Sequence, residues 1–372
     1  MPDYYIGLMS GTSMDGIDAV VVDFSNSRTP RLVCSHSHSW PEDIYQQLLT
    51  SRQLADNQLD QLHALDILLG EIFAEATLTL LNKAKLSAKE ITAIGNHGQT
   101  IRHRPDAAHP FSLQIGNAKT LAQATGIHVV SDFRTADIEA GGQGAPLAPA
   151  FHEAVLRSKN ENRGILNIGG IANLTVLPSD QTQAISGFDT GPGNNMMDAW
   201  MAKSCSQNFD KNGDFARTGK ISEDLLKQCL SDAYFKIAAP KSTGFEHFNL
   251  DWLNTQLDNC PEKNLNNADI QATLCELTAQ SISDAIKQCQ QNIDHLLVCG
   301  GGVHNSYLME RIQQALPDCK VESTEVCSIH PDWVEAMAFA WLAKRTINKQ
   351  TGNLPSVTGA KKAVILGQIT NF

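Results

Sequence analysis

Several common signatures are missing from this chain of 372 residues. No G-x-G-x-x-G occurs, and the nearest approach to a P-loop, Gly213 to Lys220, is one residue too long and is followed by Ile221 instead of Ser or Thr. Asp-Thr-Gly occurs once, at Asp189, whereas a pepsin-like protease needs two such carboxylates in one chain. These absences exclude a P-loop nucleotide site and a single-chain aspartic protease.

A surplus of positive charge is also missing. The chain has 29 Lys and Arg against 40 Asp and Glu, so its formal net charge is −11. A surface that binds duplex nucleic acid needs a basic stripe, which this balance argues against. A small anion held by a few focused donors remains compatible with it. We therefore expect a small-molecule partner and no nucleic acid.

Paired cysteines and membrane segments are absent too. The nine cysteines are scattered with no C-x-x-C pair, which indicates free thiols in a reducing compartment. No uncharged apolar run reaches membrane-spanning length, and the first residues, Met1 to Tyr5, do not resemble a secretory leader. With 42% hydrophobic and 19% charged residues, we expect a globular, cytoplasmic protein with no membrane partner, long enough for two lobes.

What the chain does contain is a glycine-bounded turn near its start. An apolar strand ending at Met9 leads into the turn Gly11–Gly16, and a second apolar strand, Ala19–Val22, follows. Small side chains let backbone N–H groups approach an anion such as phosphate, and the hydroxyls in the turn add donors. An ordinary hairpin is the competing interpretation, because glycine and serine favour turns for conformational reasons alone.

The same pattern returns in the middle of the chain. Residues 164–177 read as an apolar strand, a turn at Gly169-Gly170 and another apolar strand. Two such units in one chain suggest two related lobes, each offering a backbone turn. Glu139–Ala148, rich in Gly and Ala, is typical of a lobe boundary or hinge.

Polar groups follow two further predicted strands. Ile91–Ile94 leads into a loop in which Gln99 and Thr100 could bond sugar hydroxyls, although polar residues are also normal in a solvated loop. Arg134 follows the strand His128–Phe133 and could clamp a carboxylate with two hydrogen bonds, or serve as a plain ion-pair partner.

Three more positions invite a chemical role. Asp189 ends a strand before a Gly/Pro turn and a helix, where a carboxylate could take a proton, or could simply cap the turn. Gly300–Gly302 follow the strand His295–Cys299, and their bare backbone could lie against adenine or its ribose, or merely ease entry into a helix. Glu335 stands in the first turn of an apolar helix, favoured by the helix dipole or reaching a cleft.

Together these motifs resemble the superfamily that includes actin, heat-shock chaperones and sugar kinases, and within it the anhydro-N-acetylmuramic acid kinase family. The likeness covers essentially the whole chain; only residues 203–263 could not be matched in detail. The segments that carry it are Gly7–Asp18, Asn96–Thr100, Asp132–Arg134, Asn167–Asn173, Phe188–Asn194 and Gly300–Gly302.

The resemblance implies a fold. We expect an α/β protein with two ribonuclease-H-like lobes of the actin-like ATPase type flanking an ATP cleft. The N-terminal lobe is expected at residues 1–132 with a C-terminal return at about 337–372, and the C-terminal lobe at 133–336. The family also leads us to expect a homodimer.

The resemblance also implies a reaction. It is the ATP-dependent conversion of 1,6-anhydro-N-acetylmuramic acid to N-acetylmuramate 6-phosphate and ADP, in the recycling of cell-wall amino sugars, with Mg²⁺ expected because phosphoryl transfer needs charge neutralisation. The alternatives are another sugar kinase of the same fold, acting on an N-acetylglucosamine-type sugar, and an ATPase of the actin or chaperone class without a sugar acceptor.

The motifs then assign candidate site residues. The catalytic candidates are Asp189, as the base for water, and Glu335. The substrate candidates are Gln99, Thr100 and Arg134, with Arg134 on the lactyl carboxylate. The ATP candidates are Gly11, Thr12, Ser13, Met14, Asp15, Gly16, Ile17, Asp18, Gly169, Gly170, Asn173, Gly300, Gly301 and Gly302. No ligand of Mg²⁺ can be read from the sequence.

Overall fold

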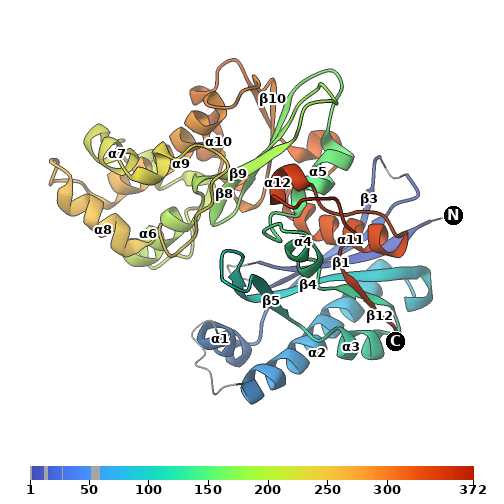
Figure 1. The fold of residues 1–372 in the computed structure, drawn as a ribbon. Helices are drawn as coiled ribbons and strands as arrows, with labels where there is room; N and C mark the ends of the chain where they lie inside the picture. Colours follow the sequence, from blue (N-terminus) through green and yellow to red (C-terminus); the bar gives the residue numbers. More distant parts are fainter. Residues whose placement is uncertain (1, 12–15, 27, 52–58) are drawn as a thin grey trace. The chain divides into compact units, whose positions relative to one another are not determined.

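The computed structural model describes residues 2–11, 16–26, 28–51 and 59–372, and divides the chain into two compact units (Figure 1). The first unit contains residues 1–155 and 328–372, and the second contains residues 156–327. The predicted turn residues Thr12 to Asp15 lie outside the described residues.

The described part of the first unit is built on a seven-stranded sheet with the order β12-β6-β4-β1-β2-β3, and β5 pairs with β4 off this path. Strands β1, β2 and β3 run antiparallel in sequence, and β4 and β6 continue the sheet parallel to β1. The bounds are β1 (Tyr4–Ser10), β2 (Ile17–Asp23), β3 (Arg31–His38), β4 (Ile91–Arg104), β5 (Phe111–Ile115), β6 (Val129–Ser131) and β12 (Gln368–Thr370).

Helices cover this sheet. Helix α2 (Leu59–Ala84) packs against β2, β3 and α3 (Ala118–Thr125), and its buried side chains join those of β1 in one hydrophobic core. The side chain of Asn117 accepts a hydrogen bond from the backbone N–H of Thr120 and so caps the start of α3. The other helices of the unit are α1 (Glu42–Ser51), α4 (Thr135–Glu139), α5 (Ala148–Leu156, which reaches into the second unit), α11 (Val334–Ile347) and α12 (Pro355–Thr358).

Helix α11 lies directly on β1 and β4 because two glycines leave room for its backbone. A Cβ atom on Gly7 would stand 1.8 Å from the carbonyl oxygen of Ala336, and one on Gly95 would stand 2.1 Å from that of Phe339. The close approach brings the C-terminal part of the chain onto the first sheet and places the first turn of α11, with Glu335, beside the end of β1.

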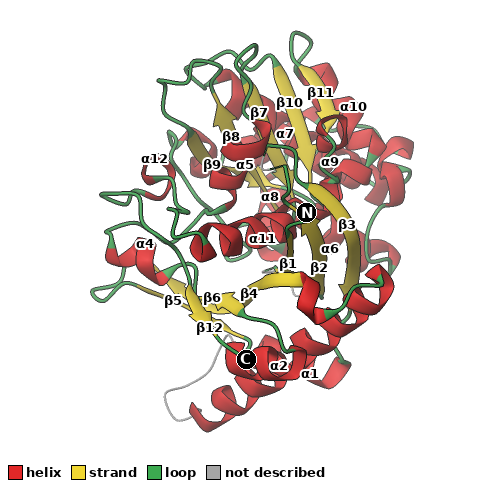
Figure 2. Cartoon of the chain, turned by 90° about the vertical axis from the view of Figure 1, so that its right-hand side faces the viewer, coloured by secondary structure: helices red, strands yellow, loops and turns green. Residues whose placement is uncertain are grey.

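The second unit repeats the strand arrangement of the first. Its sheet has the order β11-β10-β7-β8-β9, with β7, β8 and β9 antiparallel in sequence and β10 and β11 parallel to β7 (Figure 2). The bounds are β7 (Arg163–Ile168), β8 (Ile171–Leu177), β9 (Ser186–Pro192), β10 (His295–Cys299) and β11 (Lys320–Ser323), and the helices are α6 (Asn195–Cys205), α7 (Glu223–Leu230), α8 (Leu250–Asn259), α9 (Asn267–Lys287) and α10 (Ser306–Ala315).

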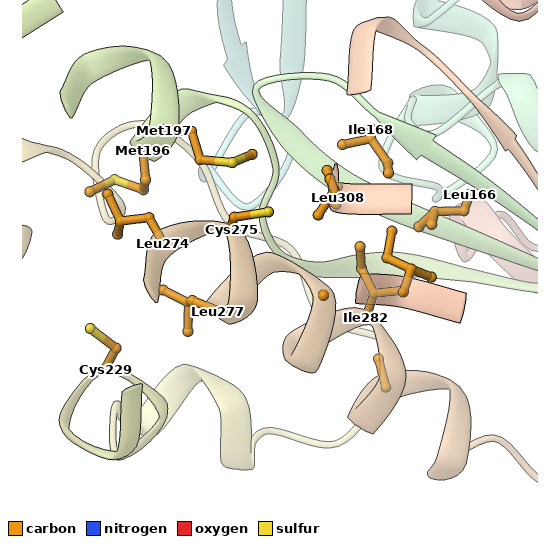
Figure 3. Close-up of a cluster of buried hydrophobic side chains, with 14 of the residues drawn as sticks. Leu166, Ile168, Met196, Met197, Cys229, Leu274, Cys275, Leu277, Ile282 and Leu308 are labelled. Carbon is orange, nitrogen blue, oxygen red and sulfur yellow. The ribbon is translucent and has the colours of Figure 1, made fainter. Parts of the chain in front are cut away.

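The core of the second unit is centred on α9, which contacts α6, α7, α10 and β9. Figure 3 shows Leu274, Leu277 and Ile282 of α9 among side chains contributed by the sheet and the other helices. Asn266 caps the start of α9. Its side-chain oxygen accepts hydrogen bonds from the backbone N–H groups of Ala268 and Asp269. The apolar side chains of α9, spaced at helical intervals, face this core.

Each sheet shows the ribonuclease-H-like order of three antiparallel strands followed by two parallel ones, so the predicted fold class is confirmed. The unit boundaries differ from the expected ones: residues 133–155 and 328–336 fall in the first unit and not in the C-terminal lobe. Long-range contacts are the reason, since Phe133 packs against Phe339 and Asp137 binds Asn353 and Thr358. Among the described residues, no helix combines the length and hydropathy needed to cross a bilayer.

Candidate functional site

Asp189 lies in the middle of β9 and not at a strand end as predicted, because the pairing of β9 with β8 continues to Pro192. Three hydrogen bonds hold it there. Its Oδ2 accepts a hydrogen bond from the N–H of Thr243 at 3.0 Å, and its own N–H donates to the carbonyl of Lys241 at 3.0 Å. The hydroxyl of Tyr234 donates to the Asp189 carbonyl oxygen at 2.7 Å. Among the described residues Oδ1 accepts no hydrogen bond, so one carboxylate oxygen is fixed and the other is available.

The electrostatic setting of Asp189 suits a proton acceptor. Burial raises its pKa to about 6, the Thr243 bond opposes that rise, and the Glu246 carboxylate adds to it. A base whose pKa lies near the working pH is both deprotonated and able to hold a proton. The structure thus gives Asp189 the property that its predicted role requires, while that role itself stays a prediction.

The turn Gly169-Gly170 between β7 and β8 lies against the start of α6. The N–H of Gly193 donates to the Gly170 carbonyl at 2.9 Å, and the N–H of Asn194 donates to the Gly169 carbonyl at 2.8 Å. A Cβ on Gly193 would stand 2.3 Å from the Gly169 oxygen, so only glycine allows this contact. A glycine turn beside a helix N-terminus is a favourable place for an anion.

The three glycines after β10 pack against the end of β7. Gly300 has φ +79°, and a Cβ there would meet the Asn167 side-chain oxygen at 2.3 Å. A Cβ on Gly302 would meet the Ile168 side chain at 2.3 Å, whereas one on Gly301 would meet nothing closer than 3.6 Å. Gly301 is exposed, so it is the member of the trio with room for a planar group above it.

The second unit therefore brings several predicted residues together. Asn173 pairs with Asp189 in the β8–β9 ladder, the Gly169-Gly170 turn contacts the start of α6, and Asn194 donates its side-chain amide to the Ile168 carbonyl at 3.1 Å. Gly300 and Gly302 touch the same β7 end. The sheet order explains this, because β8, β7 and β10 are neighbours.

In the first unit, Gln99 supports the beginning of the glycine-bounded turn. Its side chain is fully buried, its Oε1 accepts from the Ser10 hydroxyl at 2.6 Å, and its Nε2 donates to the Gly11 carbonyl at 3.2 Å. Both polar ends of the amide are thus used within the protein. The half-buried Thr100 accepts from Gln114 at 3.3 Å. That Gln99 and Thr100 bind the sugar stays a prediction.

The last residue of the turn, Gly16, and the two residues after it lie in different surroundings. Ile17 is fully buried in the core of the first unit, so its side chain is structural and only its backbone is left for a ligand. Asp18 is half-buried and accepts from the Ser37 hydroxyl at 2.9 Å. Gly16 has φ +151°, and a Cβ there would stand 2.7 Å from the His38 carbonyl oxygen.

The guanidinium group of Arg134 donates hydrogen bonds to two acceptors. One terminal nitrogen, Nη1, donates to the Gly144 carbonyl at 2.8 Å, and Nη2 donates to Nε2 of His97 at 2.8 Å. Burial lowers the pKa of Arg134 to about 10, and the nearby Glu335 and Asp137 carboxylates oppose that fall, so the guanidinium stays charged. Its Nε is buried and has no hydrogen-bond partner among the described residues.

Glu335 faces Arg134 and Asp18 from the first turn of α11. Desolvation and the Asp18 charge raise the pKa of Glu335 above its ordinary value, and Arg134 lowers it. The side chain is nonetheless exposed, so water reaches the carboxylate. The first unit therefore gathers one cation, Arg134, and two carboxylates, Asp18 and Glu335.

A pocket of about 370 Å³ opens in the first unit where β4 passes from its β6 neighbour to its β5 neighbour. His97 lines it and also binds Arg134, and Thr135 lines it next to Arg134 in the chain. The lining is polar, with Asn, Gln, Ser, Thr and Asp side chains among backbone groups, and the volume lies within the range of small-molecule sites.

Sequence reasoning missed His97, Thr243 and Tyr234 as parts of the site. His97 lies in the Asn96–Thr100 motif, next to the predicted substrate residues Gln99 and Thr100. Its position in that motif was the indication that it belongs to the site. Thr243 and Tyr234 belong to residues 203–263, the part of the chain that could not be matched in detail to the family. The structure shows that this region supplies the contacts that hold Asp189.

Comparison with known proteins identifies the family. The model of the anhydro-N-acetylmuramic acid kinase family matches residues 3–371. Curated anhydro-N-acetylmuramic acid kinases from Coxiella burnetii and Saccharophagus degradans are each 49% identical, covering 98% and 99% of this chain and 96% and 99% of their own.

A more distant likeness is to a solved activator of 2-hydroxyisocaproyl-CoA dehydratase from Clostridium difficile, with a TM-score of 0.47 and 13% identity over 91% of this chain and 92% of that one. That likeness is too remote to bear on this chain's ligands. The family match is decisive by contrast, because it spans nearly every residue and includes each motif described above. This chain belongs to the anhydro-N-acetylmuramic acid kinase family.

Proposed function

We propose that this protein uses ATP and water to convert 1,6-anhydro-N-acetylmuramic acid into N-acetylmuramate 6-phosphate and ADP, in the recycling of cell-wall amino sugars. One observation carries the proposal: relatives bearing this kinase name are 49% identical over 98% of the chain. The site chemistry agrees with it, since an acid–base carboxylate, glycine turns and a buried cation are what the reaction needs.

The substrate dictates an unusual kinase step. In the anhydro sugar O6 is bonded to C1, so there is no free 6-hydroxyl to accept a phosphoryl group. Water must add to C1 as the C1–O6 bond breaks, and the released O6 takes the γ-phosphoryl group from ATP. The water loses one proton, and ADP leaves with the electrons of the broken phosphoanhydride bond.

Asp189 is the proposed base for that water. Its raised pKa, about 6, supports this role, as does the carboxylate oxygen Oδ1, which accepts no hydrogen bond from any described residue. Arg134 is proposed to bind the lactyl carboxylate and Glu335 to orient water or sugar. Thr100 is the proposed sugar contact, and Gln99, predicted as a second one, is proposed to act through its bonds to Ser10 and Gly11 at the glycine-bounded turn. The polar pocket beside His97 is the proposed place for the ring substituents.

ATP is proposed to bind through the glycine turns. The predicted ATP residues of the first unit, from Gly11 to Asp18, would hold the β- and γ-phosphates, assisted by Gly169, Gly170 and Asn173. Gly300, Gly301 and Gly302 would take the adenosine end, where Gly301 has open space beside it.

Mg²⁺ is proposed as the partner of ATP. Among the described residues, no cluster of three or more His, Cys, Asp or Glu side chains is placed to hold a metal. Such a cluster is not required, because Mg²⁺ in kinases keeps several waters and takes one or two carboxylates besides phosphate oxygens. Asp18, which follows the predicted phosphate turn at the start of β2, is the donor that fits. When bound, the ion supplies charge neutralisation on the phosphates.

A homodimer and a cytoplasmic location complete the proposal. The first follows from the family expectation alone. The second fits an enzyme that consumes ATP and carries nine cysteines, none of them in a disulfide.

An ADP-release assay tests the proposal against its alternatives. The four arms are 1,6-anhydro-N-acetylmuramic acid, N-acetylmuramic acid, N-acetylglucosamine and no sugar. We expect ADP release only with the anhydro sugar. Strong release with N-acetylglucosamine alone would favour a different sugar kinase, and sugar-independent release would favour an ATPase. In H₂¹⁸O, the product should carry the label on C1 and not on the phosphate.

A further inference from the structure

The orientation of Arg134 is set by a contact with His97 on β4. The imidazole Nδ1 lies 2.8 Å from the Gly98 carbonyl oxygen and Nε2 lies 2.8 Å from Nη2 of Arg134. A carbonyl can only accept, and a guanidinium can only donate. The ring therefore carries its proton on Nδ1 and offers the Nε2 lone pair to the arginine.

This tautomer is maintained by the surroundings of the ring. His97 is 5% exposed and packs against Phe339, with 4.7 Å between the ring centres. Burial, together with the Arg134 charge, lowers the pKa of His97 to about 3. The imidazole thus stays neutral, and remains an acceptor for Arg134, throughout the physiological pH range.

A second support reaches Arg134 through the Gly144 carbonyl. The N–H of Gly144 donates to Asp137 Oδ2 at 2.8 Å, and the buried Asp137 also accepts from Asn353 at 2.6 Å and from Thr358 at 2.7 Å. Asp137 thereby ties the loop that carries Gly144 to the C-terminal segment. Two acceptors, each anchored independently, hold the two ends of the guanidinium.

We propose that His97 and Asp137 are positioning residues that fix Arg134 for an anionic group on the sugar, so that they determine selectivity for a carboxylate-bearing substrate. The inference rests on the proposed function, in which Arg134 binds the lactyl carboxylate. A free arginine side chain loses considerable rotamer freedom when it binds a ligand. The two contacts remove that freedom beforehand, and the buried Nε has no hydrogen-bond partner within the part of the chain that the structure describes.

The test compares His97→Phe with His97→Gln. Phenylalanine keeps the ring volume and removes the acceptor, whereas glutamine retains an oxygen that can accept from Arg134. We expect His97→Phe to raise the KM for the anhydro sugar about tenfold or more, the effect of losing one hydrogen bond to a charged group, with kcat changed much less. His97→Gln should recover most of the loss, and the Kd for ADP should be unchanged in both.

Two further measurements separate positioning from general damage. In an Arg134→Ala background, His97→Phe should add little, because the group that it positions is gone. With 1,6-anhydro-N-acetylglucosamine, which lacks the lactyl carboxylate, His97→Phe should raise the KM much less than with the carboxylate-bearing sugar, because only the pocket lining by His97 is then altered. Thr358→Val removes one bond to Asp137 and should raise the KM for the carboxylate-bearing sugar alone, by less than His97→Phe does.

The outcomes are distinguishable. Wild-type turnover of the anhydro sugar with an unchanged KM in His97→Phe overturns the inference alone, as does an equal loss on both sugars or an undiminished effect in the Arg134→Ala background. Failure of the wild type to turn over the anhydro sugar overturns the proposed function, and this inference with it.

Discussion

The carboxylate of Asp189 accepts a hydrogen bond at 3.0 Å from the backbone N–H of Thr243, which lies 54 positions further along the chain. The bond fixes one oxygen and lowers the pKa of Asp189, while burial and Glu246 raise it. A strand residue and a loop distant in the sequence thus jointly set the pKa of the proposed base.

Asp189→Asn should abolish turnover and spare nucleotide binding. Asparagine keeps the shape and can still accept from Thr243, but it cannot take a proton from water, and a positioned general base contributes about 10²- to 10⁴-fold. ADP release and the Kd for ATP are the two measurements. Asp251→Asn, at an exposed position on α8, is the matched control. Near-normal turnover in Asp189→Asn would falsify the assignment.

The pH profile should reveal the same group. Asp189 must be deprotonated to act, so kcat/KM should fall as the pH drops through about 6 and level off above it. Glu246→Gln removes a like charge that raises the pKa of Asp189, so the acidic limb should move to lower pH. A limb that stays in place in Glu246→Gln, or that lies near pH 4 in the wild type, would assign it to another group.

Gln99→Leu should weaken ATP binding more than sugar binding. The amide supports Ser10 and Gly11 at the start of the glycine-bounded turn, and leucine makes neither bond. We expect the Kd for ATP to rise several-fold with a smaller change in the sugar KM, measured by calorimetry and steady-state kinetics. Thr100→Val is the control for a direct sugar contact. The reverse pattern in Gln99→Leu would favour the predicted role of Gln99 as a sugar ligand.

Gly7→Ala should destabilise the first unit strongly. The added Cβ would lie 1.8 Å from the Ala336 carbonyl oxygen, so α11 must move off β1, at a cost of about 1–3 kcal/mol or more. Gly126→Ala is a useful comparison, because its φ of +67° is strained but its Cβ meets nothing within 4 Å, and about 1 kcal/mol is expected. Urea denaturation measures both. If the two variants lose equal free energy of unfolding, α11 can move away from β1 at little cost, and the prediction is wrong.

The free energy of unfolding should fall as the pH drops from about 6.5 toward 3, in part through two buried histidines. The pKa values of His97 and His152 are each lowered to about 3 by burial, with the Arg134 charge adding to the effect at His97. The unfolded chain binds their protons first, so each contributes up to about 1.4 kcal/mol per pH unit in that window. His97→Gln should flatten the slope in denaturation curves taken across it, and an unaltered slope would mean that His97 does not titrate there.

Local patterns in the sequence predicted much of this molecule. The glycine turn Gly169-Gly170, the strands on either side of it and the glycines that follow β10 were all read from neighbouring residues. Such features depend on backbone freedom and apolar spacing within a few positions of each other, which the sequence states directly. The family resemblance then supplied the reaction.

The contacts that complete the site depend on the tertiary structure. Nothing within a few positions of Asp189 indicates that Thr243 and Tyr234 will hold it, and nothing near Arg134 indicates His97 or Gly144 as its acceptors. The return of α11 to the first sheet likewise depends on Gly7 and Gly95 meeting a helix hundreds of positions away. The sequence alone determined the strands, turns and family, because these arise from short-range preferences and recognisable motifs. Only packing decided which distant groups meet, because that depends on the surfaces that whole elements present to one another.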